Sequence, residues 1–81
     1  MSTFKPTMEI RINLEALLDE RKVSQRELAR MINVRSASIN DMCQNKTIRM
    51  PLDNLASICE VLDVSISDVL ELVPIETKEN D

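Results

Sequence analysis

Hydrophobic residues recur every three or four positions along most of this 81-residue chain, which is the spacing of amphipathic helices. The pattern predicts helices over about 13–22, 24–32, 36–44 and 51–62, and a last helix that opens at Ser65, all joined by short linkers. The residues expected to face the core are Leu14, Leu17, Leu18, Leu28, Ala29, Ile32, Ile39, Met42, Cys43, Leu52, Leu55, Ala56, Cys59, Leu62, Ile66, Val69 and Leu70.

Residues 8–12 show a different pattern. Met8, Ile10 and Ile12 alternate with polar residues, which predicts a short strand or extended segment. The only candidate partner is 73–75, where Pro74 permits an edge position but not a sheet centre. We therefore expect a domain over 8–75, preceded by a flexible arm at 1–7 and followed by a frayed acidic tail at 76–81.

The expected helix starts carry polar capping residues. Ser24 and Glu27 form the capping-box pattern, and Ser65 and Asp68 repeat it with aspartate in the acidic position. Asn13 is expected to cap the first helix, and Pro51 suits the first turn of the fourth.

The expected helix exits must do without glycine, because the chain has none. Asn33, Asn45 and Asp63 follow the apolar stripes of the second, third and fourth helices. Asn and Asp tolerate the left-handed conformation best after Gly, so these three residues should end the helices.

The second and third helices enclose a tight turn, and residues 24–43 together show the pattern of a helix-turn-helix. Ala29 lies where the two helix axes would cross, and its small side chain lets the backbones approach. Val34 is expected to plug the turn.

Composition supports an all-α class, since Phe4 is the one aromatic residue and the core must come from aliphatic side chains and Met. The net charge of −4 divides unevenly. Residues 21–49 hold seven basic and two acidic side chains, whereas residues 51–81 hold one basic and eight acidic side chains. This asymmetry can turn a cationic face toward phosphates, although both faces could also be ordinary solvated surface.

At this point the chain resembles the Xre/Cro-type helix-turn-helix family of phage repressors and small bacterial regulators. The resemblance rests on Ser24-Gln25-x-x-Leu28-Ala29, on Val34 and Ile39, and on the pattern from Leu55 to Leu70. It implies a five-helix lambda-repressor-like DNA-binding domain of bacterial or prophage origin. The chain departs from the family in using Asn33 and Asn45 where glycines are usual, and Cys43 where many members have Glu.

The third helix can be oriented from its own pattern. If Ile39, Met42 and Cys43 face inward, the opposite face is free to enter a major groove. The base-reading candidates on that face and its flanks are Ser36, Ala37, Asn40 and Asp41. Asp41 could accept from a cytosine amino group and Ala37 could pack on a thymine methyl, although plain solvent exposure is the alternative for each.

The phosphate-binding candidates are Gln25, Arg35, Ser38, Lys46 and Arg49. The resemblance assigns Gln25 its contact at the start of the second helix, and Arg49 could instead enter the minor groove. A reader with so few contacts should bind double-stranded DNA as a homodimer. Its candidate interface is the last helix with Leu72, Val73 and Ile75, together with the segment near Ile10 and Ile12, unless these residues only close the monomer core.

Catalysis finds no support, because His and Tyr are absent and no phosphate-binding loop is recognisable. We expect no cofactor, no metal and no membrane segment, and a cytoplasmic location. Cys43 and Cys59 are expected to act as small hydrophobic residues, with a redox switch between them as the alternative.

The leading hypothesis is a sequence-specific repressor. The alternative is a protein-binding module on the same fold, such as an antitoxin, an antirepressor or an accessory subunit.

Overall fold

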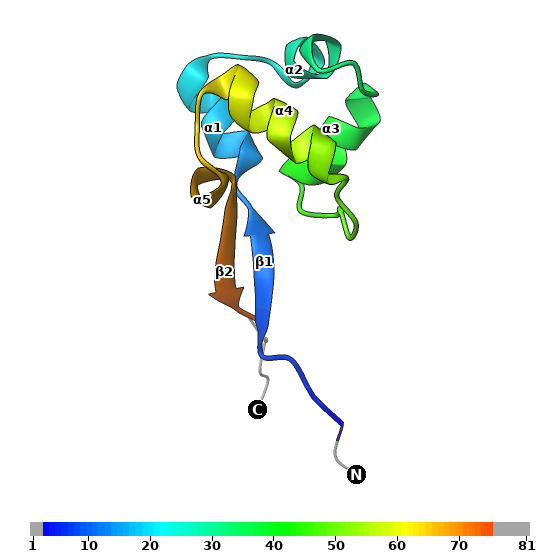
Figure 1. Ribbon diagram of the computed structural model, residues 1–81, viewed down its shortest axis with the longest axis vertical. Coiled ribbons are helices and arrows are strands. Elements are labelled where there is room, and N and C mark those ends of the chain that lie inside the picture. Colours follow the sequence, from blue (N-terminus) through cyan, green and yellow to red (C-terminus); the bar gives the residue numbers. More distant parts are fainter. Residues whose placement is uncertain (1–2, 76–81) are drawn as a thin grey trace.

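The computed structural model describes residues 3–75, and within this range the chain forms five helices and two strands. The elements are β1 (Met8–Ile12), α1 (Leu14–Arg21), α2 (Gln25–Met31), α3 (Ser36–Cys43), α4 (Leu52–Leu62), α5 (Ile66–Val69) and β2 (Leu70–Pro74). Figure 1 shows the helices gathered in one body, from which β1 and β2 project as a ribbon.

The core lies between the helices, and each helix contributes at least one buried aliphatic residue. The largest fully buried side chains are Leu14, Leu28, Ile39, Met42, Ile58 and Val69. This confirms most of the predicted core. Ile58 was missing from the predicted core. It forms the buried face of α4 together with Leu55 and Leu62, which follow at helical spacing.

Three residues predicted to be buried are exposed. Leu52, in the first turn of α4, is 79% exposed, and Ile66, at the start of the single-turn helix α5, is 59% exposed. Leu52 and Ile66 each lie three residues before the first buried residue of the helix, Leu55 in α4 and Val69 in α5, so the core covers neither helix start. Ala56 follows the buried Leu55 and is turned by about 100° away from the core.

The helix exits confirm the predicted left-handed residues. Asn33, Asn45 and Asp63 have φ values of 60°, 59° and 57°. Lys22 was not predicted, yet it ends α1 with φ 58°.

Both predicted capping boxes are present, at Ser24 and at Ser65. Two other helix starts differ from prediction. Pro51 is the N-cap of α4 rather than part of its first turn. Asn13 occupies the N-cap position of α1, but its side chain donates to Glu71 Oε1 at 3.1 Å instead of capping the helix.

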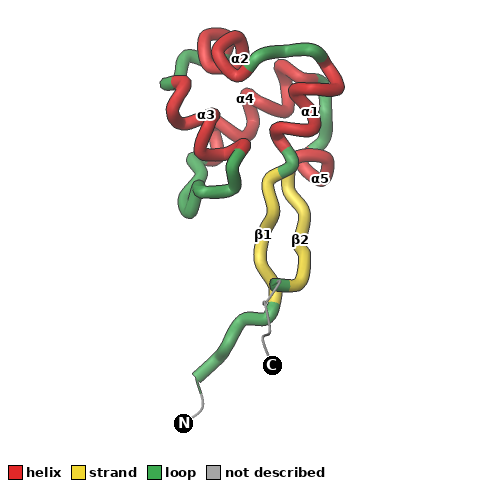
Figure 2. The backbone as a smooth tube through the Cα atoms, turned by 180° about the vertical axis from the view of Figure 1, so that it is seen from behind, coloured by secondary structure: helices red, strands yellow, loops and turns green. Residues whose placement is uncertain are grey.

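The strand pairing corrects a purely all-α class and shortens the predicted last helix. β1 and β2 lie side by side (Figure 2) and are antiparallel. Ile10 is opposite Leu72, and Ile12 is opposite Leu70. Leu70 therefore begins a strand instead of continuing α5, because from this position the chain alternates against the apolar residues of β1. The predicted tail at 76–81 and the first two residues of the predicted arm lie outside the described residues.

Candidate nucleic-acid interface

The segment α2–turn–α3 has the geometry expected of a helix-turn-helix. Ala29 is 3% exposed, and its carbonyl accepts a hydrogen bond from the backbone N–H of Val34 at 2.9 Å. Val34 packs half-buried against the core. The turn is thus closed by a backbone bond and an apolar plug, which fixes α3 relative to α2.

The orientation of α3 agrees with the prediction. Ile39, Met42 and Cys43 are buried, and the predicted base-reading residues are all exposed, namely Ser36, Ala37, Asn40 and Asp41. Asn40 is partly engaged, because its Oδ1 accepts a hydrogen bond from Gln44 Nε2 at 3.2 Å. The side chain is exposed, which leaves its amide nitrogen available as a donor.

Several predicted contact residues line one groove. Ser38 and Asp41 of α3 meet Lys46 and Arg49 of the following loop at a groove that continues to Asn54 of α4. The loop that carries Lys46 and Arg49 therefore borders the exposed face of α3. The neutral side chains of Ser38 and Asn54 lie beside it. This arrangement can hold a phosphate at its rim while α3 faces the base edges.

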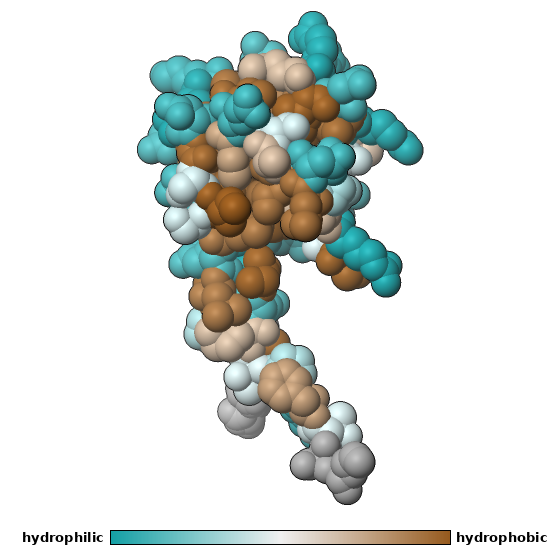
Figure 3. Space-filling model, in the orientation of Figure 1, coloured by the Kyte–Doolittle hydropathy of each residue, from teal (hydrophilic) through white to brown (hydrophobic). Residues whose placement is uncertain are grey.

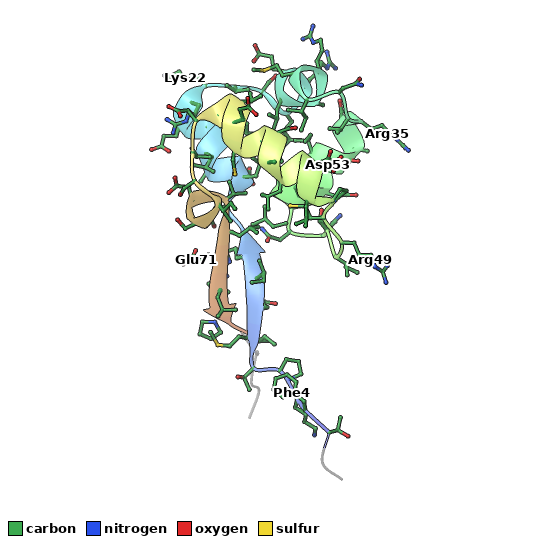
Figure 4. All side chains as sticks on the ribbon, viewed as in Figure 1. Phe4, Lys22, Arg35, Arg49, Asp53 and Glu71 are labelled. Carbon is green, nitrogen blue, oxygen red and sulfur yellow. The ribbon has the colours of Figure 1, made fainter. Side chains whose placement is uncertain are left out.

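The remaining predicted phosphate contacts lie at helix starts. Arg35 is the N-cap residue of α3, and Gln25 is the first residue of α2, where its side chain is half-buried. Figure 4 shows Arg35 and Arg49 extending away from the body on the same side. The cationic residues thus flank α3 at both ends rather than forming one cluster.

Two polar residues of the groove were not predicted as contact residues. Asn54 and Thr47 are half-buried and line it together with the predicted residues. Asn54 joins the groove because α4 begins beside the end of α3. The capping pattern at Pro51 located that helix start, but the sequence held no signal for its position in space.

The two cysteines differ in burial. Cys43 is buried, and desolvation, with the nearby carboxylates of Glu15 and Asp19, raises the pKa of its thiol from 9.0 to about 11. Cys59 is half-buried against the core.

Among residues 3–75, no group of three or more His, Cys, Asp or Glu side chains could hold a metal ion. Within the same range no helix has the length and apolar character that crossing a membrane requires.

Comparison with known proteins agrees with this geometry. The Cro/C1-type HTH DNA-binding domain family matches residues 13–74. The uncharacterized HTH-type transcriptional regulator YozG of Bacillus subtilis (strain 168) is 31% identical over 64 residues, which are 79% of this chain and 76% of YozG.

Two solved structures share the fold. The crystal structure of the transcriptional regulator VanUg has a TM-score of 0.71 at 25% identity, over 93% of this chain and 99% of that chain. A candidate DNA-binding protein from Bacteroides fragilis has a TM-score of 0.71 at 24% identity, over 78% of this chain and 100% of that chain. The second likeness concerns the fold alone.

Proposed function

The chain belongs to the Cro/C1-type helix-turn-helix family of DNA-binding domains, and from this premise we propose that it is a sequence-specific repressor of bacterial or prophage origin. A repressor of this size would act by occupying a promoter. The observation that carries the proposal is the exposed face of α3, with basic residues at both of its ends.

In this proposal α3 enters the major groove. Asp41 accepts from a cytosine amino group, Ala37 packs on a thymine methyl group, and Ser36 bonds to either kind of base edge. Asn40 donates through its amide nitrogen, since Gln44 already occupies its oxygen. These are short side chains that make single contacts, so each base pair contributes modest discrimination.

Phosphate contacts supply most of the affinity. Arg35, Lys46 and Arg49 neutralise phosphates beside α3, and Ser38 is a neutral donor in the groove that Lys46 and Arg49 also line. Gln25 meets a phosphate at the start of α2, where the positive end of the helix supports an anion. About three neutralised phosphates, one for each of Arg35, Lys46 and Arg49, would leave one subunit a weak binder at physiological salt.

A homodimer on a two-fold site follows from this weakness. Two subunits that bind inverted half-sites about one DNA turn apart double the phosphate contacts and the base contacts. Double-stranded DNA and a second copy are therefore the proposed partners.

The test is selection of bound duplexes from a random double-stranded pool at about 100 mM salt, because phosphate contacts alone retain less DNA as salt rises. The double variant Arg35→Glu/Lys46→Glu runs in parallel. Enrichment of two inverted half-sites about 10 base pairs apart by the wild type, and by the wild type alone, would support the proposal.

The opposite result has a clear meaning. If the folded wild type enriches no sequence, it is not an autonomous reader. The same fold would then serve as a protein-binding module. A partner complex made by the acidic part of the chain, which includes α4 and α5, would survive the Arg35→Glu/Lys46→Glu change.

A further inference from the structure

The free edge of β1 offers unpaired backbone groups. Asn13 N–H bonds to Val69 O at 2.7 Å, and Ile75 N–H bonds to Thr7 O at 2.9 Å. With the observed register, this places the backbone groups of Glu9 and Arg11 toward β2, because bonded pairs alternate in an antiparallel ladder. The backbone groups of the even-numbered residues therefore point outward.

The outward edge of β1 is closed at both ends. At Ile12, the side chain of Asn45 satisfies both backbone groups, with bonds of 2.7 Å and 3.0 Å. At the other end, Pro6 has no N–H to donate. Within residues 3–75 this leaves Met8 and Ile10 with an open N–H and an open C=O each.

The free edge of β2 is less suited to pairing. The backbone N–H of Leu70 already donates to Ile66 O, and Pro74 has no N–H. Leu72 alone among the three outward residues of this strand keeps both groups available. An additional strand would therefore gain more hydrogen bonds along β1.

One face of the ribbon is apolar and uncovered. Met8, Ile10 and Leu72 lie on the same face as the buried Ile12, and Ile10 and Leu72 are 56% and 62% exposed. Figure 3 shows apolar side chains running from the helical body onto the ribbon. Next to Ile10 and Ile12 this face continues into an apolar groove whose exposed members are Ile48 and Leu52.

We propose that two copies of this chain pair through their β1 edges, antiparallel about a two-fold axis at Glu9. Met8 of each copy exchanges two backbone hydrogen bonds with Ile10 of the other, which gives four bonds and a four-stranded sheet in the order β2-β1-β1-β2. This deepens the proposed homodimer and rests on it. The occupant is a second copy because the open edge is complementary to itself in the antiparallel direction, and the two apolar faces join on one side of the sheet.

Asn45 disfavours one of the two neighbouring symmetric registers. A shift that placed Ile10 opposite Ile10 would bring Met8 of one copy to Ile12 of the other, where the Asn45 amide already occupies both backbone groups and Met8 would lose its bonds. The proposed register brings Pro6 to that position, and Pro6 has no N–H to leave unpaired. In the proposed register the opposite face sets Glu9 across from Glu9. Each Glu9 has Arg11 of the other copy as a diagonal neighbour, so the long Arg side chain can reach that carboxylate as well as Glu71, which lies opposite it in its own copy.

Cysteine crosslinking tests the register directly. Glu9 pairs with itself at a non-hydrogen-bonded position, where Cα atoms lie about 4.5 Å apart and a disulfide can form. In a Cys59→Ser background, Glu9→Cys treated with oxidised glutathione should become mostly covalent dimer. The matched control Arg11→Cys is equally exposed but lies four residues from its own copy, about 13 Å, and should stay monomeric on a non-reducing gel.

A mixed reaction adds a positive control for the same register. Thr7→Cys and Arg11→Cys face each other across the dimer, so the mixture should crosslink while neither variant does alone. If Glu9→Cys forms no more covalent dimer than Arg11→Cys, the proposed pairing is wrong.

Proline substitution tests the edge itself. Ile10→Pro removes an outward N–H that the monomer does not use, and therefore two of the four bonds between copies. We expect sedimentation equilibrium to show a dimer weakened about tenfold or more by Ile10→Pro, with little change for the matched variant Leu72→Pro on the other edge.

These measurements need no DNA. A wild type that sediments as a monomer at micromolar concentration would overturn the pairing while leaving DNA binding to be judged by duplex selection. Loss of DNA binding in Arg35→Glu/Lys46→Glu with an intact Glu9→Cys crosslink would separate the two proposals in the other direction.

Discussion

The side-chain amide of Asn45 forms hydrogen bonds with both backbone groups of Ile12. Its Oδ1 accepts from Ile12 N–H at 2.7 Å, and its Nδ2 donates to Ile12 O at 3.0 Å. These residues are 33 positions apart, at the end of α3 and the end of β1. The side-chain amide thus pairs with Ile12 as a neighbouring strand would, and it links the end of the proposed recognition helix to β1.

Replacing Asn45 by Gly should separate the contribution of its left-handed backbone from that of its side-chain hydrogen bonds. Glycine keeps the left-handed backbone at φ 59° but loses both hydrogen bonds, so we expect unfolding in urea to show a loss of about 1–2 kcal/mol. Asn45→Ala should cost about 1 kcal/mol more, because alanine also resists the left-handed conformation. Asn33→Gly, at an exposed residue with φ 60°, is the matched control and should change stability little. Equal effects at Asn33 and Asn45 would contradict a structural role for the amide bonds.

Lys22 stores strain that a substitution can release. It is exposed and ends α1 with φ 58°, a conformation that costs a residue other than Gly, Asn or Asp about 1 kcal/mol. Lys22→Asn should therefore stabilise the protein by about 0.5–1 kcal/mol in thermal or urea unfolding. Lys22→Ala removes the same side chain without relieving the backbone, and a gain of equal size from that variant would refute the explanation.

The Cys43 thiol should make stability depend on alkaline pH. Burial, with Glu15 and Asp19 nearby, raises its pKa to about 11 from 9.0, so the unfolded chain releases this proton first as pH rises. The contribution is complete below pH 9 and is lost between about pH 9 and pH 11. Relative to Cys43→Ala, the wild type should lose about 1 kcal/mol of unfolding free energy between about pH 8 and pH 10. An unchanged difference between the two proteins would mean that the folded thiol titrates normally.

Local chemistry made much of this fold predictable. The capping box at Ser24 and the left-handed exits at Asn33 and Asp63 depend on residues close in sequence, so their pattern is visible in the chain alone. Lys22 adopts the same conformation without any intrinsic preference for it. Its exit is closed by the backbone bond from Val23 N–H to Leu18 O at 3.0 Å, with Val23 packed against the core, and the lysine itself gives no signal for it.

Tertiary placement decided what could not be predicted. Leu70 fits a helix stripe as well as a strand, and only the register with Ile12 makes it a strand residue. The exposed face of α3 followed from its own periodicity. The groove shared by Lys46 and Asn54 depends on where α4 begins in space, so its far wall was missed.

Salt dependence should report the proposed phosphate contact of Lys46. Each neutralised phosphate contributes a slope of about −0.9 to the plot of log affinity against log salt concentration, so the basic contacts of Arg35, Lys46 and Arg49 predict about −2.7 per subunit. Lys46→Ala should reduce the magnitude of this slope by about 0.9 per subunit and weaken binding to all sequences alike. Lys22→Ala, at a distant exposed lysine, should leave the slope unchanged. If Lys46→Ala instead changes sequence preference at one base pair, Lys46 contacts a base.

Asp41 provides the sharpest test of base reading. Its carboxylate only accepts hydrogen bonds, which suits a cytosine amino group, whereas an amide of the same size both donates and accepts and suits adenine. Asp41→Asn should therefore change the preferred base from C to A at one position in each half-site, with discrimination of about 1–3 kcal/mol. The side chain is exposed, so the fold should be unaffected. Glu60→Gln removes the same charge from an exposed position of α4 and serves as the matched control. If Asp41→Asn raises affinity for every sequence by the same factor, the carboxylate merely repels DNA and reads no base.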